Sequence, residues 1–356
     1  MVKNMLRDNT NVVRIRNKLL GGKNKILVQT MAKTKTSNTE AIIKLANDLY
    51  IAGADLLRVS ILDEHDAKSL KTIVNNSPLP IIADLHFNKD LALKAIDNGA
   101  DKIRINPGNF HQDDLKEIIE RAKYFNIPIR IGINSGSLSL NHTKDTSSIN
   151  EYFSLLDSTI DIFKKYDYDK NLVLALKSTD PNLTFKLYRA AAELYLYPLH
   201  IGLTESGFGS VGAIRSSICL VPLLQLGIGN TIRISLSDSP ITEVETVNAL
   251  LKGLGLKNDV PTLITCPTCG RTQCDVSNLA KRISELLLPI EADIKVAIMG
   301  CPVNGPGEAK DADFGLAGTK NAYLTFERGK KGTILKEEEA YQWMKDKLSS
   351  FKKRCI

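Results

Sequence analysis

The chain has 356 residues, of which 43% are hydrophobic and 24% are charged, and its formal net charge is +7. This length allows two domains, or one large barrel with an appendage, and it is enough to bury a core without disulfides. The charge is too small and too dispersed to indicate nucleic-acid binding, so it fits simple solubility or an anionic ligand.

The N-terminus has charged residues where a signal peptide would be apolar, which argues against secretion. No uninterrupted apolar run approaches the roughly 20 residues that a membrane helix needs. Six cysteines in a chain of this length do not make a disulfide framework, and they indicate metal or redox use in a reducing compartment. The sequence therefore predicts a cytoplasmic protein with no membrane and no nucleic-acid partner.

From residue 26 onward, short apolar or β-branched runs alternate with longer segments of helical periodicity. The short runs predict strands at residues 26–31, 55–61, 79–85, 101–106, 127–133, 172–178, 199–205 and 230–236. The longer segments predict helices at residues 39–51, 66–75, 89–98, 113–125, 181–194, 211–224 and 242–251. Gly53, Gly99 and Gly227 follow three of these helices, where a left-handed cap is needed.

Strands that alternate with helices indicate right-handed βαβ units and a parallel sheet. About eight such units in roughly 230 residues match the size of a TIM (β/α)8 barrel, so the predicted fold class is α/β. A doubly wound open sheet is the main alternative, but no glycine-rich dinucleotide fingerprint supports it. The long polar segment at residues 134–149 follows the fifth strand, and its length predicts a loop that can serve as a lid.

The alternation ends near residue 257, and a different set of elements follows. Strands are predicted at residues 263–265, 295–299, 321–327 and 333–335, and helices at residues 276–288 and 337–348. About 100 residues of this kind are enough for an independent unit. We therefore predict a TIM-barrel domain at residues 1–257 and a small α+β domain at residues 258–356.

Polar side chains gather at the carboxyl ends of the predicted barrel strands. They are Arg58, Asp84, His86, Arg104, Asn106, Arg130, Asn134, Lys177, Glu205, Arg233 and Ser235, and His200 lies within the seventh predicted strand. In a barrel, alternate strand residues point inward and the carboxyl ends of the strands converge on one mouth. The cations among them would repel each other unless a polyanion bound between them, and guanidinium forks match phosphate oxygens. The pattern predicts a site for a diphosphate.

Other readings of individual residues stay open. Any single arginine can point outward to a helix carboxylate, although cations on several strands at the same end favour a site. Asp84 and His86 are two residues apart on one strand, and such a pair can act as acid and base. Glu205 is either a proton donor or a contact that caps a helix.

Three cysteines lie in two turn-rich segments, each of which follows a predicted strand. Cys266 and Cys269 form a C-x2-C pair that can grip a metal from one turn, and Cys301 follows the next strand. Cys274 could supply a fourth thiolate, so the spacing leaves both a structural zinc site and an iron–sulfur cluster open. Cys219 lies in an apolar helix and is predicted to be a buried hydrophobic residue.

Three segments resemble the family of 4-hydroxy-3-methylbut-2-enyl diphosphate synthases of the non-mevalonate isoprenoid pathway, in their compact two-domain bacterial form. The segments are Cys266-Pro-Thr-Cys-Gly-Arg271, Met299-Gly-Cys-Pro-Val-Asn-Gly-Pro-Gly-Glu308 and Gly227-Ile-Gly-Asn-Thr-Ile-Arg-Ile-Ser235. That family opens the ring of 2-C-methyl-D-erythritol 2,4-cyclodiphosphate and dehydrates it in a two-electron reduction, with flavodoxin or ferredoxin as the electron donor.

The resemblance implies a [4Fe–4S] cluster in the second domain, with Cys274 as a bystander. The implied cluster ligands are Cys266, Cys269, Cys301 and Glu308, of which the glutamate is expected to yield its iron to substrate. The implied substrate-binding residues are Arg58, Arg104, Arg130, Asn134, Lys177, Arg233 and Ser235. The implied groups for acid/base chemistry are Asp84, His86 and Glu205. A head-to-tail homodimer is also implied, in which the cluster domain of one subunit caps the barrel of the other.

The two rival function classes are a non-redox zinc enzyme and a radical S-adenosylmethionine enzyme, and a pure binding module is the least favoured alternative. A phosphate-binding barrel with zinc would be a non-redox lyase or aldolase. A pure binding module would not need both an acid/base pair and a redox cluster. A radical S-adenosylmethionine barrel would need a C-x3-C-x2-C motif inside the barrel, and the sequence has none there.

Overall fold

The computed structural model describes residues 6–134, 146–303 and 309–355. It divides the chain into two compact units, Met1–Leu250 and Leu251–Ile356, a division that precedes the boundary predicted after residue 257. No helix in the described ranges is both long enough and apolar enough to cross a membrane.

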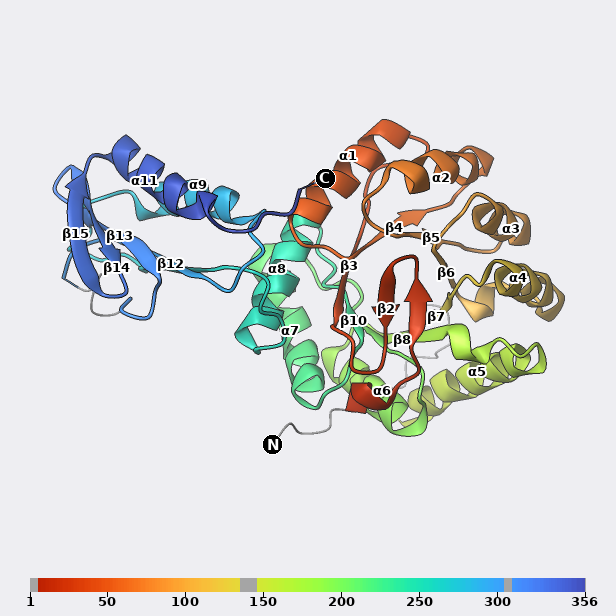
Figure 1. Ribbon diagram of the computed structural model, residues 1–356. Coiled ribbons are helices and arrows are strands. Elements are labelled where there is room, and N and C mark those ends of the chain that lie inside the picture. Colours follow the sequence, from red (N-terminus) through yellow and green to blue (C-terminus); the bar gives the residue numbers. More distant parts are fainter. Residues whose placement is uncertain (1–5, 135–145, 304–308, 356) are drawn as a thin grey trace. The chain divides into compact units, whose positions relative to one another are not determined.

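Eight parallel strands form a barrel in the first unit (Figure 1). In barrel order they are β3 (Leu27–Met31), β4 (Leu56–Ser60), β5 (Ile81–Asp84), β6 (Lys102–Ile105), β7 (Ile129–Asn134), β8 (Leu172–Lys177), β9 (His200–Ile201) and β10 (Thr231–Ile232). β10 pairs with both β9 and β3, and a parallel bridge from Leu174 to Leu199 joins β8 to the start of β9 and closes the sheet. The predicted α/β class and the TIM barrel are confirmed.

Helices surround the barrel, one after each strand (Figure 1). They are α1 (Thr39–Ile51), α2 (Glu64–Asn76), α3 (Lys89–Asp97), α4 (Gln112–Phe125), α5 (Thr146–Lys165), α6 (Pro181–Leu194), α7 (Gly209–Gln225) and α8 (Pro240–Gly253). Short 3-10 turns lie at Leu6–Asn9, Pro107–Asn109 and Asp169–Asn171. Side chains of Asn38 and Asp63 accept hydrogen bonds from the first turns of α1 and α2, which fixes where these helices begin. The predicted left-handed glycines after α1, α3 and α7 are confirmed.

Helix α5 was not predicted. It begins at Thr146, inside the segment 134–149 that the sequence analysis assigned to a loop, so that prediction was wrong for the end of the segment. Tyr152, Leu156, Ile160 and Phe163 are buried along one face of α5, at the spacing of an amphipathic helix. Residues 135–145 lie outside the described part of the chain, and the predicted lid remains a prediction.

A β-hairpin that the sequence analysis missed covers the amino-terminal end of the barrel (Figure 1). Its strands are β1 (Val13–Ile15) and β2 (Lys18–Leu20), each of only three residues. Val13, Ile15 and Leu20 pack against Leu27, Leu56, Ile82 and Val173 of the barrel strands. This apolar plug seals one end of the barrel, so its interior can open only at the carboxyl ends of the strands, which we call the mouth.

Within its described residues, the second unit is a five-stranded mixed sheet with the two helices α9 and α11. Its elements are β11 (Thr262–Thr265), α9 (Val276–Leu287), β12 (Lys295–Met299), β13 (Phe314–Thr319), β14 (Ala322–Glu327), β15 (Lys330–Leu335) and α11 (Glu337–Ser349). β11, β12 and β13 pair in parallel, and β13, β14 and β15 pair antiparallel. The strand at Phe314–Thr319 was not predicted, because Gly315 and Gly318 interrupt its apolar pattern.

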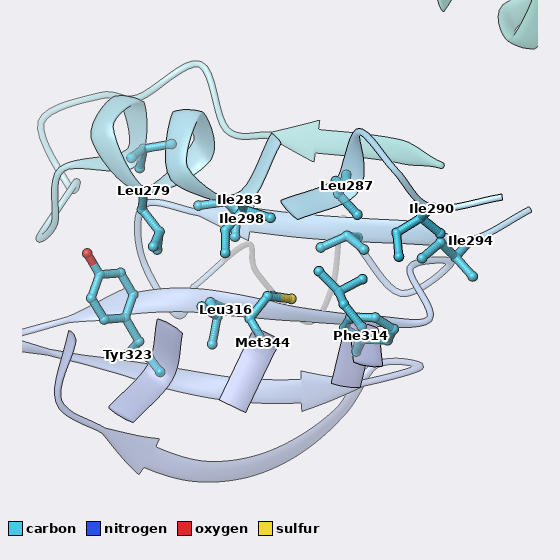
Figure 2. Packing of buried hydrophobic residues seen from close by; sticks show 14 residues of the cluster. Leu279, Ile283, Leu287, Ile290, Ile294, Ile298, Phe314, Leu316, Tyr323 and Met344 are labelled. Carbon is cyan, nitrogen blue, oxygen red and sulfur yellow. The ribbon is translucent and has the colours of Figure 1, made fainter. Parts of the chain in front are cut away.

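Both helices of this unit pack on the sheet and build its hydrophobic core (Figure 2). Leu279, Ile283 and Leu287 lie on one face of α9 at a spacing of four residues, and Met344 enters from α11. They surround Ile298, Leu316, Phe314 and Tyr323, which the sheet contributes. The core fixes the sheet under α9, and the loops that contain the cysteines leave the ends of β11 and β12.

Candidate active site

The mouth of the barrel contains a cavity of about 290 Å³. Its lining includes all the barrel residues that the sequence analysis proposed for substrate binding and acid/base chemistry, together with positions that it did not propose. The lining residues are Arg58, Asp84, His86, Arg104, Arg130, Gly132, Asn134, Ala175, Lys177, Thr204, Glu205, Arg233 and Ser235. We call this space the mouth cavity. The structure thus brings the predicted residues together, and their roles remain predictions.

The electrostatic character of the mouth cavity is strongly positive, because five of its lining residues are cations. Arg130 is 1% exposed, and Arg104, Lys177 and Arg233 are also buried. Burial, together with the neighbouring Arg233 and Arg104, lowers the pKa of Arg58 to about 10. Burial and the surrounding arginines likewise hold the pKa of Lys177 well below its usual range. An anion in the cavity would relieve this repulsion.

Asp84 is the main internal counter-ion of these cations. Its carboxylate lies 3.3 Å from Nη1 of Arg104 and 3.9 Å from Nε of Arg58. Burial opposes ionisation, but Arg58, His86 and Arg104 outweigh it and hold the pKa of Asp84 well below its usual range. Asp84 therefore stays ionised at neutral pH and is better suited to orienting its neighbours than to donating a proton.

His86 contacts both the cation cluster and the solvent. Its Nε2 lies 2.8 Å from Nη1 of Arg104, and its Nδ1 lies 3.2 Å from the Asn109 amide. A guanidinium has no acceptor, so Nε2 accepts this hydrogen bond. A histidine next to an anion site can take part in proton transfer.

Glu205 lines the cavity from the loop after β9, and its side chain is exposed. Its backbone is left-handed, with φ of +52°, a strained conformation that often occurs at functional sites. The alternative role as a helix cap is not supported, because the N-cap of α7 is Phe208. Glu205 therefore remains a candidate proton donor.

Glu243, which the sequence analysis did not single out, holds Arg233 in place. It lies in the first turn of α8, is 1% exposed, and accepts hydrogen bonds from Nε and Nη2 of Arg233 at 3.1 and 3.2 Å. It also accepts from the Thr30 hydroxyl at 2.7 Å and from the backbone N–H of Leu236 at 3.0 Å. Such a network fixes a guanidinium at the rim of the cavity.

Two glycines, Gly132 in β7 and Gly202 directly after β9, make room for the cations. A Cβ atom at Gly132 would lie 2.7 Å from Nε of Arg104. A Cβ atom at Gly202 would lie 2.6 Å from Nζ of Lys177 and from the carbonyl oxygen of Arg233. A glycine inside a strand often marks such a close approach, and this signal was available in the sequence.

In the second unit, the cysteines lie where two parallel strands end. Cys266 follows β11 and donates its N–H to the Ile298 carbonyl, and Cys301 follows β12. The N–H of Gln273 donates to the Gly300 carbonyl, which ties the loop that contains Cys269 to the one that leads to Cys301. The two cysteine-bearing loops are thus neighbours.

The donor chemistry of these loops fits a thiolate-held cluster. None of the three cysteines forms a disulfide in the described part of the chain, and the N–H of Thr268 donates to Sγ of Cys266 at 3.4 Å, a contact typical of cluster sulfurs. Glu308 lies outside the described residues, and within those residues no three Cys, His, Asp or Glu side chains converge as a ready metal site. Sγ of Cys274 lies 3.9 Å from the Met299 carbonyl and 4.0 Å from the Gly300 carbonyl, and burial raises the pKa of its thiol.

Comparisons with known proteins agree with this arrangement. The GcpE TIM-barrel domain matches residues 10–248, and the GcpE protein C-terminal domain matches residues 262–350. The chain is 41% identical to the 4-hydroxy-3-methylbut-2-en-1-yl diphosphate synthase (flavodoxin) of Malacoplasma penetrans, over 97% of this chain and 95% of that one. It is 43% identical to the protein of the same name from Caldanaerobacter subterraneus subsp. tengcongensis, over 94% of each.

Among solved structures, a dihydropteroate synthase from Xanthomonas albilineans aligns with 70% of this chain and 98% of its own, with a TM-score of 0.52 and 14% identity. At this identity the likeness shows the barrel fold alone. The two domain matches and the relatives above 40% identity show more: the chain belongs to the GcpE family of 4-hydroxy-3-methylbut-2-en-1-yl diphosphate synthases.

Proposed function

We propose that this chain converts 2-C-methyl-D-erythritol 2,4-cyclodiphosphate into 4-hydroxy-3-methylbut-2-enyl diphosphate by a two-electron reductive ring opening and dehydration. The observation that supports this most is the set of five cations that line one buried cavity with Asp84 as their main internal counter-ion. A diphosphate supplies the charge that such a cavity lacks, and its oxygens match guanidinium forks. The names of the relatives agree with this substrate class.

The residues of the mouth cavity divide into binding and proton-transfer groups. Arg58, Arg104, Arg130, Lys177 and Arg233 would bind the phosphate oxygens, while Asn134 and Ser235 would bind the remaining polar groups of the substrate. Loss of a hydroxyl as water requires a proton donor. His86 and Glu205 are the candidates, because Asp84 is held ionised and instead orients its arginines and His86.

The second unit would hold a [4Fe–4S] cluster through Cys266, Cys269, Cys301 and Glu308. When bound, this cluster supplies the two electrons of the reaction one at a time. The proposed electron donor is a flavodoxin, or alternatively a ferredoxin. Cys274 is proposed to remain a free thiol.

We further propose that the chain acts in the cytoplasm as a head-to-tail homodimer, in which the cluster domain of one subunit completes the barrel site of the other. Analytical ultracentrifugation of the cluster-loaded protein is expected to show a dimer. A fully active monomer would contradict this assembly.

The proposed activity is tested with anaerobically purified protein, reduced flavodoxin and the cyclic diphosphate. Formation of the linear diphosphate, followed by phosphorus NMR, together with about four irons and four sulfides per chain, is the expected result. A colourless protein with stoichiometric zinc and no reductive product would instead favour a non-redox lyase.

The fit between Gly132 and Arg104 gives a first prediction. Gly132→Ala places a methyl group 2.7 Å from Nε of Arg104, so the guanidinium must move away from the phosphate position. The KM for the cyclic diphosphate is expected to rise roughly 10- to 100-fold, since small misplacements have effects of this size. Gly253→Ala is the matched control, because a Cβ atom there meets nothing within 4 Å. Equal KM values in the two variants would refute the role of Arg104.

Glu243 gives a second prediction. Glu243→Gln removes the charge that orients Arg233 but keeps the size of the side chain. Because a hydrogen bond to a charged group contributes about 1.5–3 kcal/mol, the KM is expected to rise roughly tenfold or more with a smaller change in kcat. Glu245→Gln changes an exposed carboxylate on the same helix and should alter neither. A loss of stability without any change in KM would mean that Glu243 has a purely structural role.

A further inference from the structure

Beneath the mouth cavity lies a layer of buried polar side chains, of which only Arg130 is also proposed to bind substrate. The layer consists of Gln29 of β3, Lys102 of β6, Arg130 of β7 and His200 of β9, each at most 1% exposed, and we call it the polar floor. Lys102 lies two residues before Arg104 on β6, and alternate residues of a strand share a face. Its side chain therefore points into the barrel directly below a proposed phosphate ligand.

The polar floor is not satisfied within the described part of the chain. Nζ of Lys102, Nε2 of His200, Nε and Nη1 of Arg130, and both amide atoms of Gln29 are buried there without a hydrogen-bond partner. Buried polar atoms are almost always paired, and an unpaired buried charge is far more unfavourable than an unpaired neutral group. Protonation of the Lys102 amine is therefore unfavourable when the cavity is empty.

The groups that face Lys102 are cationic or neutral. Arg58 acts on it from β4 and Arg130 from β7, His200 interacts with it from β9, and Ile82 pairs with it on β5. Burial, followed by Arg130 and Arg58, holds the pKa of Lys102 well below its usual range. The Asp84 carboxylate acts on Arg58 and Arg130 rather than on Lys102.

We propose that Lys102 is a proton-accepting residue of the polar floor, a neutral amine in the empty barrel that takes up one proton when the cyclic diphosphate binds above it. The proton comes from solvent and ends on Nζ of Lys102. The inference rests on the proposed function, because it requires a diphosphate between Arg104 and Arg130. Lys102 would act as a positioning residue, because it would not contact the substrate itself. Its positive charge would act on those two arginines, which are the proposed phosphate ligands.

This coupling has a definite sign. The complex would hold more protons than the free protein, so affinity must fall as the pH rises between the two protonation midpoints of Lys102. The ligand itself does not titrate in this range, because each phosphorus of a cyclic diphosphate has a single, strongly acidic oxygen. If one proton is coupled to binding, the Kd rises by up to about tenfold for each unit by which the pH rises. Any contribution of Lys177 and His86 adds to this effect.

The test is calorimetric titration of the full-length, cluster-loaded protein with 2-C-methyl-D-erythritol 2,4-cyclodiphosphate, without reductant. It is performed at pH 8 to 9, above the ordinary pKa of histidine, in buffers of different ionisation enthalpy. Lys102→Met and Lys102→Gln are each expected to take up about one proton fewer than the unmodified chain, and to lose about one unit from the slope of log Kd against pH. His200→Gln is expected to keep the proton uptake.

The possible outcomes separate this inference from the function on which it rests. Binding without proton uptake by the unmodified chain would refute the role of Lys102, whether or not its variants fold, and would leave the substrate assignment intact. Equal uptake in the unmodified chain and the Lys102 variants would refute it as well, as would loss of the proton in His200→Gln alone. Failure of the unmodified chain to bind the cyclic diphosphate would refute both.

Discussion

Arg130→Met is expected to weaken binding of the cyclic diphosphate by roughly 100-fold or more, while leaving the barrel at least as stable as before. Arg130 is 1% exposed, and its Nε and Nη1 have no hydrogen-bond partner in the described residues. Burial, Arg58 and Arg104 together hold the pKa of its guanidinium well below the usual range, which shows that its charge is unfavourable in the empty cavity. Methionine has a similar length and removes this charge, and replacing buried charges by apolar groups is often neutral or stabilising.

Two measurements on the same variant check this prediction. Calorimetry should show a loss of affinity of roughly 100-fold or more, because a buried charge-assisted contact contributes about 2–5 kcal/mol to binding. The midpoint of thermal unfolding should stay the same or rise by a few degrees. Arg121→Met is the matched control, since Arg121 is 41% exposed and pairs with Asp97 on the outside of the barrel. If Arg130→Met binds the cyclic diphosphate with unchanged affinity, Arg130 is not part of the binding site.

If both results hold, the cations of the mouth cavity strengthen diphosphate binding but lower the stability of the folded protein. Its cations are kept close together by strands that are already fixed by the apolar hairpin plug and the surrounding helices. Asp84 and Glu243 offset part of the resulting repulsion in the free protein, and a bound anion would offset more of it. Such a stored strain pre-organises the site, as is common for active sites.

The sequence was sufficient to predict the barrel and the set of residues at its mouth, because both depend on short-range patterns. Arg58, Arg104 and Arg233 lie at inward positions of strands whose apolar runs are plain in the sequence. The rule that carboxyl ends of parallel strands meet at one mouth then places these residues together. No knowledge of helix packing is needed for this step.

The parts that were missed depend on tertiary contacts or on very short elements. Glu243 matters because the first turn of α8 lies against Thr30 and Arg233, which are 213 and 10 residues away in sequence. Lys102 was within a predicted strand, but its isolation from carboxylates appears only when Arg58, Arg130 and His200 are placed around it. The three-residue strands β1 and β2 are too short for a periodic signal.

Cys301→Ser is expected to abolish turnover and iron binding while leaving the binding of the cyclic diphosphate intact. Cys301 is 6% exposed, and it follows β12 beside the loop that contains Cys266 and Cys269. A serine hydroxyl is a poor substitute for a thiolate, so a cluster held by three cysteines and Glu308 should be lost. The proposed phosphate-binding cations all belong to the barrel unit, and their geometry does not depend on this side chain.

Iron and sulfide analysis, the visible absorption spectrum and calorimetry on the same sample separate these two effects. Cys274→Ser is the most informative comparison, because its thiol is nearby in sequence but interacts with Tyr323 and with carbonyl oxygens of the β12 end. It should keep the iron and most of the activity, as should Cys355→Ser at the exposed terminus. If instead Cys274→Ser loses the metal and Cys301→Ser retains it, the cysteine ligands are those of the C-x2-C-x4-C run, and the proposed ligand set is refuted.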